Sequence, residues 1–170
     1  MLVDAGTGTN YKKTKKDLEK NGTELENIDF LVNTHCHYDH AGGDKNFLEV
    51  SGCKLFASEP AKKALESGDQ QVTLASLFGT QLEPLSVSKS LKEGDRIELG
   101  DRTLRVVSTP GHTKGSISLY EPEQKVLFSG DTVFKGGVGR TDLPTSNKKE
   151  MIESLRKISE LEIKSLYPGH

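Results

Sequence analysis

The chain has 170 residues, of which 33% are apolar and 28% charged, with a net charge of −2. This length suits one soluble domain, and the balanced charge provides no basic surface for nucleic acid, so we expect no nucleic-acid partner. No apolar run approaches the roughly 18 residues that cross a bilayer, and the first residues, MLVDAGTG, become polar too early for a signal peptide. We therefore expect no membrane partner. Two cysteines, Cys36 and Cys53, are too few for a disulfide framework, which favours a cytoplasmic protein.

Strand-like and helix-like segments alternate along the first half of the chain. Apolar runs predict strands at 1–4, 28–34 and 54–57, and amphipathic or capped segments predict helices at 11–20, 45–50 and 60–67. The first of these helices should end at Asn21–Gly22, because glycine tolerates the left-handed backbone that closes a helix. Its lysines, interrupted by acids, indicate a face in contact with solvent.

The second half begins with a predicted hairpin centred on Gly100–Asp101, where apolar and polar residues alternate on both sides. Strands at 116–120 and 125–131 follow, joined by the turn EPEQ. A glycine-rich loop at 132–147 precedes an amphipathic helix whose apolar stripe is predicted from its spacing: Met151, Ile152, Leu155 and Ile158. A strand and its loop, SLYPGH, close the chain. The pattern is that of one α/β domain without internal repeats.

Three of the five histidines lie within six positions of the segment NTHCHYDHAGG. His35 and His37 follow a predicted strand and should point to the same side of an extended segment. If the segment then curls into a helix, Asp39 and His40 turn towards a second point nearby. Imidazole and carboxylate groups are the usual ligands of zinc and related metals, so this spacing predicts a metal site.

The remaining histidines and one aspartate lie in similar positions at the ends of predicted strands. His112 follows the Pro-Gly turn of STPGHTKGS, His170 follows that of YPGH, and Asp131 ends the strand in LFSGDT. A single histidine in a loop is usually a surface residue. Here all of these residues lie where α/β folds gather their ligands, which favours one shared site.

The motif THCHYDHAGG, followed by PGHT, SGDT and PGH in this order and spacing, resembles the metallo-β-lactamase-fold hydrolase superfamily. Asp131 stands where zinc β-lactamases carry a cysteine, so the pattern is closer to the glyoxalase II (hydroxyacylglutathione hydrolase-like) branch. The resemblance implies an α/β fold, a four-layer αββα sandwich. Against this family the chain lacks the first N-terminal strands and the C-terminal extension, so we expect residues 1–170 to be a single, truncated domain. The missing strands would expose a sheet edge and favour a homo-oligomer.

The resemblance also implies a ligand set for two divalent metal ions, zinc in the first place, with iron and manganese as alternatives. His35, His37 and His112 would hold the first metal. Asp39, His40 and His170 would hold the second, and Asp131 would bridge the two. The expected function is then a dinuclear metallohydrolase, in which a metal-activated hydroxide attacks the carbonyl of a small thioester or ester. Asp39 would be the catalytic residue that orients the nucleophile, and Cys36 would be a packed, inert thiol.

The segment GGVGRTDLP, residues 136–144, resembles the GRTD loop of glyoxalase-II-like thioesterases and persulfide dioxygenases. Arg140 could bind a substrate carboxylate by a two-pronged contact, or it could pair with Asp142 at the surface. Tyr38, inside the metal motif, could line the mouth of the site and contact substrate, or it could serve packing.

Two further functions remain open from the sequence. The first is a mononuclear iron persulfide dioxygenase, with His35, His37 or His112 and a carboxylate as a facial triad. The second is a non-catalytic, truncated domain that binds metal for stability or interaction. A nuclease is disfavoured, because neither a basic patch nor an inserted nucleic-acid domain is visible.

Overall fold

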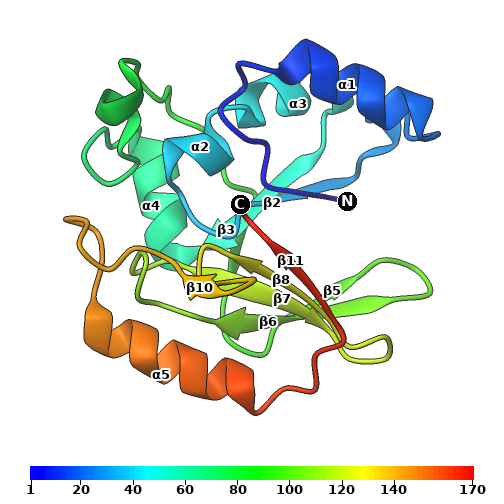
Figure 1. Cartoon of the computed structure of the whole chain (residues 1–170). Helices are drawn as coiled ribbons and strands as arrows, with labels where there is room; N and C mark the ends of the chain where they lie inside the picture. Colours follow the sequence, from blue (N-terminus) through cyan, green and yellow to red (C-terminus); the bar gives the residue numbers. More distant parts are fainter. The chain divides into compact units, whose positions relative to one another are not determined.

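Figure 1 shows the computed structural model of the chain, which describes residues 1–170. Strands and helices alternate, as the sequence predicted. The helices are α1 (Tyr11–Lys20), α2 (Tyr38–Ala41), α3 (Asp44–Ser51), α4 (Glu59–Ser67) and α5 (Lys148–Ser159), with 3-10 turns at Leu25–Asn27 and Ala75–Phe78. The strands are β1 (Leu2–Val3), β2 (Phe30–Val32), β3 (Lys54–Ser58), β4 (Lys89–Leu91), β5 (Arg96–Glu98), β6 (Thr103–Ser108), β7 (Ile117–Glu121), β8 (Val126–Gly130), β9 (Val133–Phe134), β10 (Gly137–Val138) and β11 (Ser165–Pro168). None of the helices combines the length and the apolar character that crossing a bilayer requires.

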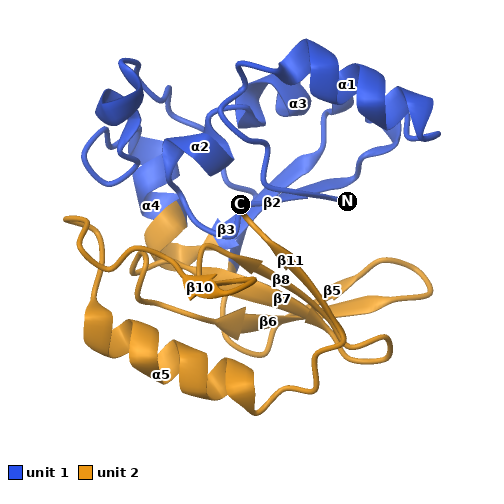
Figure 2. Ribbon diagram, in the orientation of Figure 1, with its two compact units in different colours: residues 1–57, 62–90 blue, residues 58–61, 91–170 orange.

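The chain forms two compact units, coloured separately in Figure 2. Unit 1 comprises residues 1–57 and 62–90, and unit 2 comprises residues 58–61 and 91–170. Each unit is built around its own sheet. That the whole chain acts as a single domain stays a prediction.

Unit 1 is built on a four-stranded sheet in the order β1-β2-β3-β4. β2 pairs in parallel with both β1 and β3, and its residues Leu31 and Val32 are fully buried. This burial explains why the sequence of this strand is apolar at consecutive positions. β1 lies at the edge of the sheet, and a homo-oligomer formed through an exposed edge stays a prediction.

Helix α1 ends where the sequence predicted, because Asn21 closes it and Gly22 follows with a left-handed φ of +80°. It buries none of its residues fully, which agrees with the expected solvent-facing lysines. Its contact with the rest of unit 1 includes Tyr11, whose ring meets Phe47 of α3 edge to face at 5.1 Å.

Unit 2 is built on a five-stranded sheet in the order β11-β8-β7-β6-β5. β5 to β8 pair antiparallel, and the predicted hairpin between β5 and β6 is confirmed, with Gly100 at a φ of +86°. β11 adds to the sheet parallel to β8. Helix α5 packs on this sheet through a small core that joins Ile158 to residues of three strands, namely Val107, Tyr120 and Leu127 (Figure 1).

The buried face of α5 differs in one position from the predicted stripe. Met151 and Ile158 are buried, but Ile152 is 43% exposed, so its place on the same apolar stripe was wrongly predicted. The buried face runs through positions 151, 154 and 158, and Ile152 lies about 100° around the helix from Met151. Ser154 takes the inner position, where its hydroxyl donates a hydrogen bond to the Pro110 carbonyl at 2.6 Å.

Several short elements were not predicted from the sequence, among them the two 3-10 turns. Strand β4 was not predicted, and the loop expected at 132–147 contains the small antiparallel hairpin of β9 and β10. Both strands of this hairpin have two residues each, which is too short for an alternating pattern to be visible in a sequence.

Candidate metal centre

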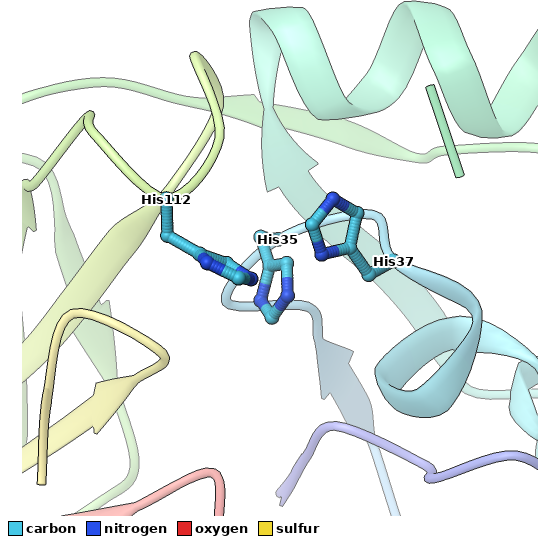
Figure 3. Close-up of side chains that lie close together, drawn as sticks. All are labelled: His35, His37 and His112. Carbon is cyan, nitrogen blue, oxygen red and sulfur yellow. The ribbon is translucent and has the colours of Figure 1, made fainter. Parts of the chain in front are cut away.

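The first ligand cluster, His35, His37, Asp39 and His40, lies in unit 1 directly after strand β2. His35 and His37 belong to the extended segment, and α2 then turns Asp39 and His40 inwards. Ligand atoms of His35, Asp39 and His40 lie within 4.8 Å of one another. The rings of His35 and His37 stand edge to face with centroids 4.8 Å apart, and Figure 3 draws both side chains, as well as His112 of unit 2. The structure thus brings the unit 1 residues of the histidine motif together.

Asp4 orients this cluster, and the sequence analysis missed it. Its Oδ2 atom lies 2.8 Å from Nδ1 of His40. The same carboxylate accepts hydrogen bonds from the backbone N–H and the hydroxyl of Thr34, each at 2.7 Å. Because a carboxylate only accepts, Nδ1 of His40 must carry a proton. In the neutral ring, the lone pair on Nε2 can then bind a metal ion.

Thr34 orients the ring of His35. Its Nδ1 lies 3.1 Å from Oγ1 of Thr34, whose hydroxyl proton is already directed to Asp4. Nδ1 of His35 therefore donates, and Nε2 again presents its lone pair.

Asp4 sits at the end of β1 with a left-handed φ of +54°, a conformation that costs about 1–3 kcal/mol for a residue other than glycine. The signal in the sequence was an acidic residue at the end of the apolar strand MLVD.

Asp44, the first residue of α3, is fully buried. Asn33 donates a hydrogen bond to its Oδ1 at 3.2 Å, and Oδ2 has no hydrogen-bond partner. Burial raises the pKa of Asp44 well above its ordinary value of 3.8, and the nearby charge of Asp4 adds to the rise. Burial therefore favours the neutral form of the Asp44 carboxyl group.

The second ligand cluster, His112, Asp131 and His170, lies in unit 2. His112 and Asp131 follow β6 and β8, and His170 follows β11. Nε2 of His112 is 3.5 Å from Oδ2 of Asp131, and Nε2 of His170 is 3.7 Å from the same oxygen. One carboxylate oxygen thus faces two imidazole nitrogens.

Backbone geometry places His112 in this cluster. The preceding residue, Gly111, has a φ of +140°, and a Cβ atom added there would come within 2.5 Å of the Met151 backbone. Nδ1 of His112 lies 3.0 Å from the carbonyl oxygen of Arg140. A carbonyl only accepts, so Nδ1 carries the proton and Nε2 presents its lone pair towards Asp131.

The Arg140 side chain forms the two-pronged contact with Asp142 that the sequence left open as an alternative. Nε and one Nη atom of Arg140 donate to the two carboxylate oxygens of Asp142 at 2.9 and 2.8 Å. These hydrogen bonds lower the pKa of Asp142, and both side chains are about two-thirds exposed. Contact of Arg140 with a substrate stays a prediction.

Cys36 and Tyr38 flank the ligands in unit 1. Cys36 is 2% exposed and burial raises the pKa of its thiol to about 12, which fits the packed, inert thiol that was predicted. Tyr38 packs its ring at 5.5 Å from Phe78, and its backbone N–H donates to Thr73 at 2.8 Å. Tyr38 also lines a small cavity of about 150 Å³ in unit 1. Its contact with a substrate stays a prediction.

The donor atoms of the two clusters fit a metal of the zinc, iron or manganese type. These metals take neutral imidazole nitrogen and carboxylate oxygen, and three of the histidines are oriented to offer Nε2. Hydrogen bonds at the other ring nitrogen are typical of histidines that bind metals.

The comparison with known families agrees with this donor set. Residues 1–170 match the family model of the Metallo-beta-lactamase superfamily, and the chain belongs to this superfamily of metal-dependent hydrolases. It has the α/β metallo-β-lactamase fold, as the motifs predicted. Within the superfamily it falls in the glyoxalase II-like branch.

Three relatives illustrate this placement. The probable metallo-hydrolase MJ0888 of Methanocaldococcus jannaschii is 40% identical over 175 residues, covering 100% of this chain and 82% of the relative. A hydroxyacylglutathione hydrolase of Hyphomonas neptunium is 36% identical, covering 100% of this chain and 60% of the relative. The acyl-coenzyme A thioesterase MBLAC2 of Gallus gallus is 36% identical, covering 82% of this chain and 55% of the relative. The chain thus spans little more than half the length of the two thioester hydrolases.

A solved structure shares the fold over nearly the whole chain. The protein TTHA1623, in a di-iron-bound form, has a TM-score of 0.81 and 30% sequence identity, covering 99% of this chain and 80% of that one. The superfamily binds divalent metals, and the His and Asp groups described above are candidate ligands in this chain.

Proposed function

We propose that this protein is a dinuclear metallohydrolase that cleaves a small thioester or ester. The main observation behind the proposal is the position of Asp131 Oδ2, which lies 3.5 Å from Nε2 of His112 and 3.7 Å from Nε2 of His170. A carboxylate that faces two imidazoles at such distances is suited to binding two metal ions at once.

The two ligand clusters would together form one centre. In this proposal His35, His37 and His112 hold the first metal, Asp39, His40 and His170 hold the second, and Asp131 contacts both. Zinc is the proposed metal, with iron and manganese as alternatives that accept the same donors. Bound metals of this kind lower the pKa of water towards neutrality and polarise a carbonyl oxygen.

The residues of the chain would supply orientation and proton transfer. Hydrogen bonds at Nδ1 of His35, His40 and His112 would keep each Nε2 directed to the metal ion. Asp39, at the first turn of α2, is the proposed catalytic residue, which orients the attacking water and accepts its proton. Tyr38 is proposed to contact the substrate, whereas Arg140 could do so only by leaving its partner Asp142.

The relatives support a thioester as the substrate. Two of them are described as a hydroxyacylglutathione hydrolase and an acyl-coenzyme A thioesterase, and both names refer to thioesters. Asp131 in place of a cysteine separates the site from zinc β-lactamases that carry one. Both cysteines of the chain are free, which supports the proposal that the protein works in the cytoplasm.

The test is hydrolysis by protein that has been stripped of metal and reconstituted with zinc. A glutathione thioester, an acyl-coenzyme A thioester and an uncharged oxygen ester would be compared, with release of free thiol or alcohol as the readout. We expect turnover of at least one thioester, its loss in Asp131→Asn, and its retention in Asp101→Asn, a matched change in the exposed turn of the β5–β6 hairpin.

Other outcomes would replace the proposal. Oxygen consumption with glutathione persulfide by the iron-loaded protein, without thioester hydrolysis, would identify a persulfide dioxygenase. Full metal binding without turnover of any of these substrates would support a non-catalytic metal-binding domain.

A further inference from the structure

We propose that the segment Gly139–Asp142 is a positioning clamp for the second ligand cluster. In this proposal the carbonyl of Arg140 fixes the ring of His112, and the contact between Arg140 and Asp142 holds that carbonyl in place. The inference rests on the proposed function for what His112 binds, but the contacts that define the clamp all lie within unit 2.

The first contact sets the tautomer of His112. Nδ1 of His112 lies 3.0 Å from the Arg140 carbonyl oxygen, and only the tautomer with a proton on Nδ1 makes this hydrogen bond. The ring then presents Nε2 towards Asp131 Oδ2 at 3.5 Å. Moving the carbonyl would free the ring to rotate and to exchange tautomers, so the position of this one oxygen determines how His112 meets a metal.

The second contact is the close approach of Gly139 to two candidate metal ligands, His112 and Asp131. A Cβ atom added at Gly139 would lie 1.8 Å from the Asp131 carbonyl oxygen and 3.3 Å from Cβ of His112. The Gly139 N–H also donates to the Thr132 carbonyl at 3.3 Å. The backbone of the clamp therefore packs directly on His112 and Asp131, and only glycine leaves room for it.

The third contact is the two-pronged pair of Arg140 and Asp142, with donor–acceptor distances of 2.9 and 2.8 Å. Both side chains are about two-thirds exposed, so the pair adds little to the free energy of unfolding. In this proposal the two parallel hydrogen bonds instead fix the backbone from residue 140 to residue 142. The Arg140 carbonyl lies at the start of this segment. A substrate carboxylate that bound Arg140 in the same way would have to displace Asp142.

The chain offers a matched control in the same unit. Arg96 and Glu98, on strand β5, are also two residues apart, with Nε and Oε1 at 3.4 Å and side chains 70% and 64% exposed. No metal ligand is among the residues of β5. Arg96→Ala therefore removes an exposed pair of the same spacing without touching the clamp.

The first test measures the tautomer of His112 by ¹⁵N NMR of the full chain, with all five histidines labelled, before and after zinc is added. We expect His112 to be protonated at Nδ1 in the wild type and to show mixed tautomers or exchange broadening in Arg140→Ala. The double change Arg140→Asp with Asp142→Arg restores a pair of opposite charges and should recover the wild-type signal. Arg96→Ala should leave it unchanged.

The second test is zinc affinity, measured by competition with a chelator. Loss of a group that orients a metal-binding histidine typically weakens affinity 10- to 100-fold, and we expect this for Arg140→Ala but not for Arg96→Ala. Turnover adds a third readout, since the clamp predicts a lower kcat with a nearly unchanged KM, whereas a substrate grip by Arg140 predicts a higher KM.

The clamp is overturned if Arg140→Ala leaves both the His112 signal and the zinc affinity equal to those of Arg96→Ala. A raised KM for charged thioesters in the charge-swapped variant, with normal zinc affinity in Arg140→Ala, would assign Arg140 to the substrate instead. Neither the NMR nor the affinity measurement needs turnover. A wild type that hydrolyses neither the thioesters nor the oxygen ester therefore contradicts the proposed function and leaves the clamp to be decided by these two readouts.

Discussion

The two ligand clusters are held in place by different means. In the first cluster the histidines are 1–3% exposed, and the side chains of Thr34 and Asp4 orient two of them. In the second cluster a backbone carbonyl orients His112, and the side chain of His170 is 55% exposed. Orientation in unit 1 thus depends on side-chain chemistry, whereas in unit 2 it depends on the path of the backbone.

This difference predicts how each cluster responds to substitution. A conservative change of a carboxylate to an amide should disturb the first cluster strongly, because it exchanges an acceptor for a donor. The second cluster should be disturbed most by loss of its shared carboxylate or by a shift of the backbone around it.

Asp131→Ala should have the largest effect. Because Asp131 faces both His112 and His170, its loss should lower metal occupancy at both proposed sites and abolish turnover. Elemental analysis and a thioester assay measure the two effects, with Asp101→Ala as the control in an exposed turn. If Asp131 serves only as a turn residue, its loss should cost about 1 kcal/mol of stability, and the variant should keep two metals and full activity, which would refute the bridge.

Asp4→Asn should weaken metal binding by about 10- to 100-fold without unfolding the protein. An amide in place of the carboxylate presents N–H groups to Thr34 or to Nδ1 of His40, both of which donate in the wild type. His40 would then favour the tautomer that places its proton on Nε2, the atom needed for the metal.

Zinc competition and thermal unfolding together check this prediction. Asp17→Asn, on the solvent-facing helix α1, is the matched control. A variant with the zinc affinity of the wild type would show that Asp4 does not determine the tautomer, and the contrast between the two clusters would then be wrong.

Asp44→Asn should have the smallest effect, visible only in how stability depends on pH. The pKa of Asp44 is raised in the folded state, so above pH 3.8 the unfolded chain loses a proton that the folded protein keeps. The contribution of Asp44 to the free energy of unfolding is therefore fully present below pH 3.8, and it is lost as the pH rises above this value. An asparagine resembles the neutral acid and removes the effect.

Urea unfolding of metal-free protein at several pH values between 4 and 8 measures this contribution. The variant should gain stability relative to the wild type as pH rises. Parallel stability curves for the two proteins would mean that Asp44 is ionised in the folded state, contrary to the expected effect of its burial.

The sequence predicted those parts of the fold and site that depend on local patterns. The histidine motif is nearly contiguous, and the helix at 11–20 and the hairpin at Gly100–Asp101 have clear end signals, so all three could be recognised. Ile152 was misplaced, because apolarity alone does not show which face of α5 meets the sheet.

Contacts between distant residues were beyond the reach of these patterns. Asp4 and His40 are 36 positions apart, and the Arg140 carbonyl and His112 are 28 positions apart. The second contact has no side-chain signature, since every residue has a carbonyl group. The GRTD segment drew attention to the guanidinium of Arg140, whereas the atom that contacts a candidate ligand is its backbone oxygen.

The most direct test of the proposed centre is the number of metal ions bound per chain. Protein stripped of metal, reconstituted with zinc and freed of excess would be analysed by elemental mass spectrometry against its amino-acid content. The proposal predicts two zinc ions per chain in the wild type, because the ligands of both clusters are then engaged. One zinc ion per chain, under conditions that saturate binding, would contradict it.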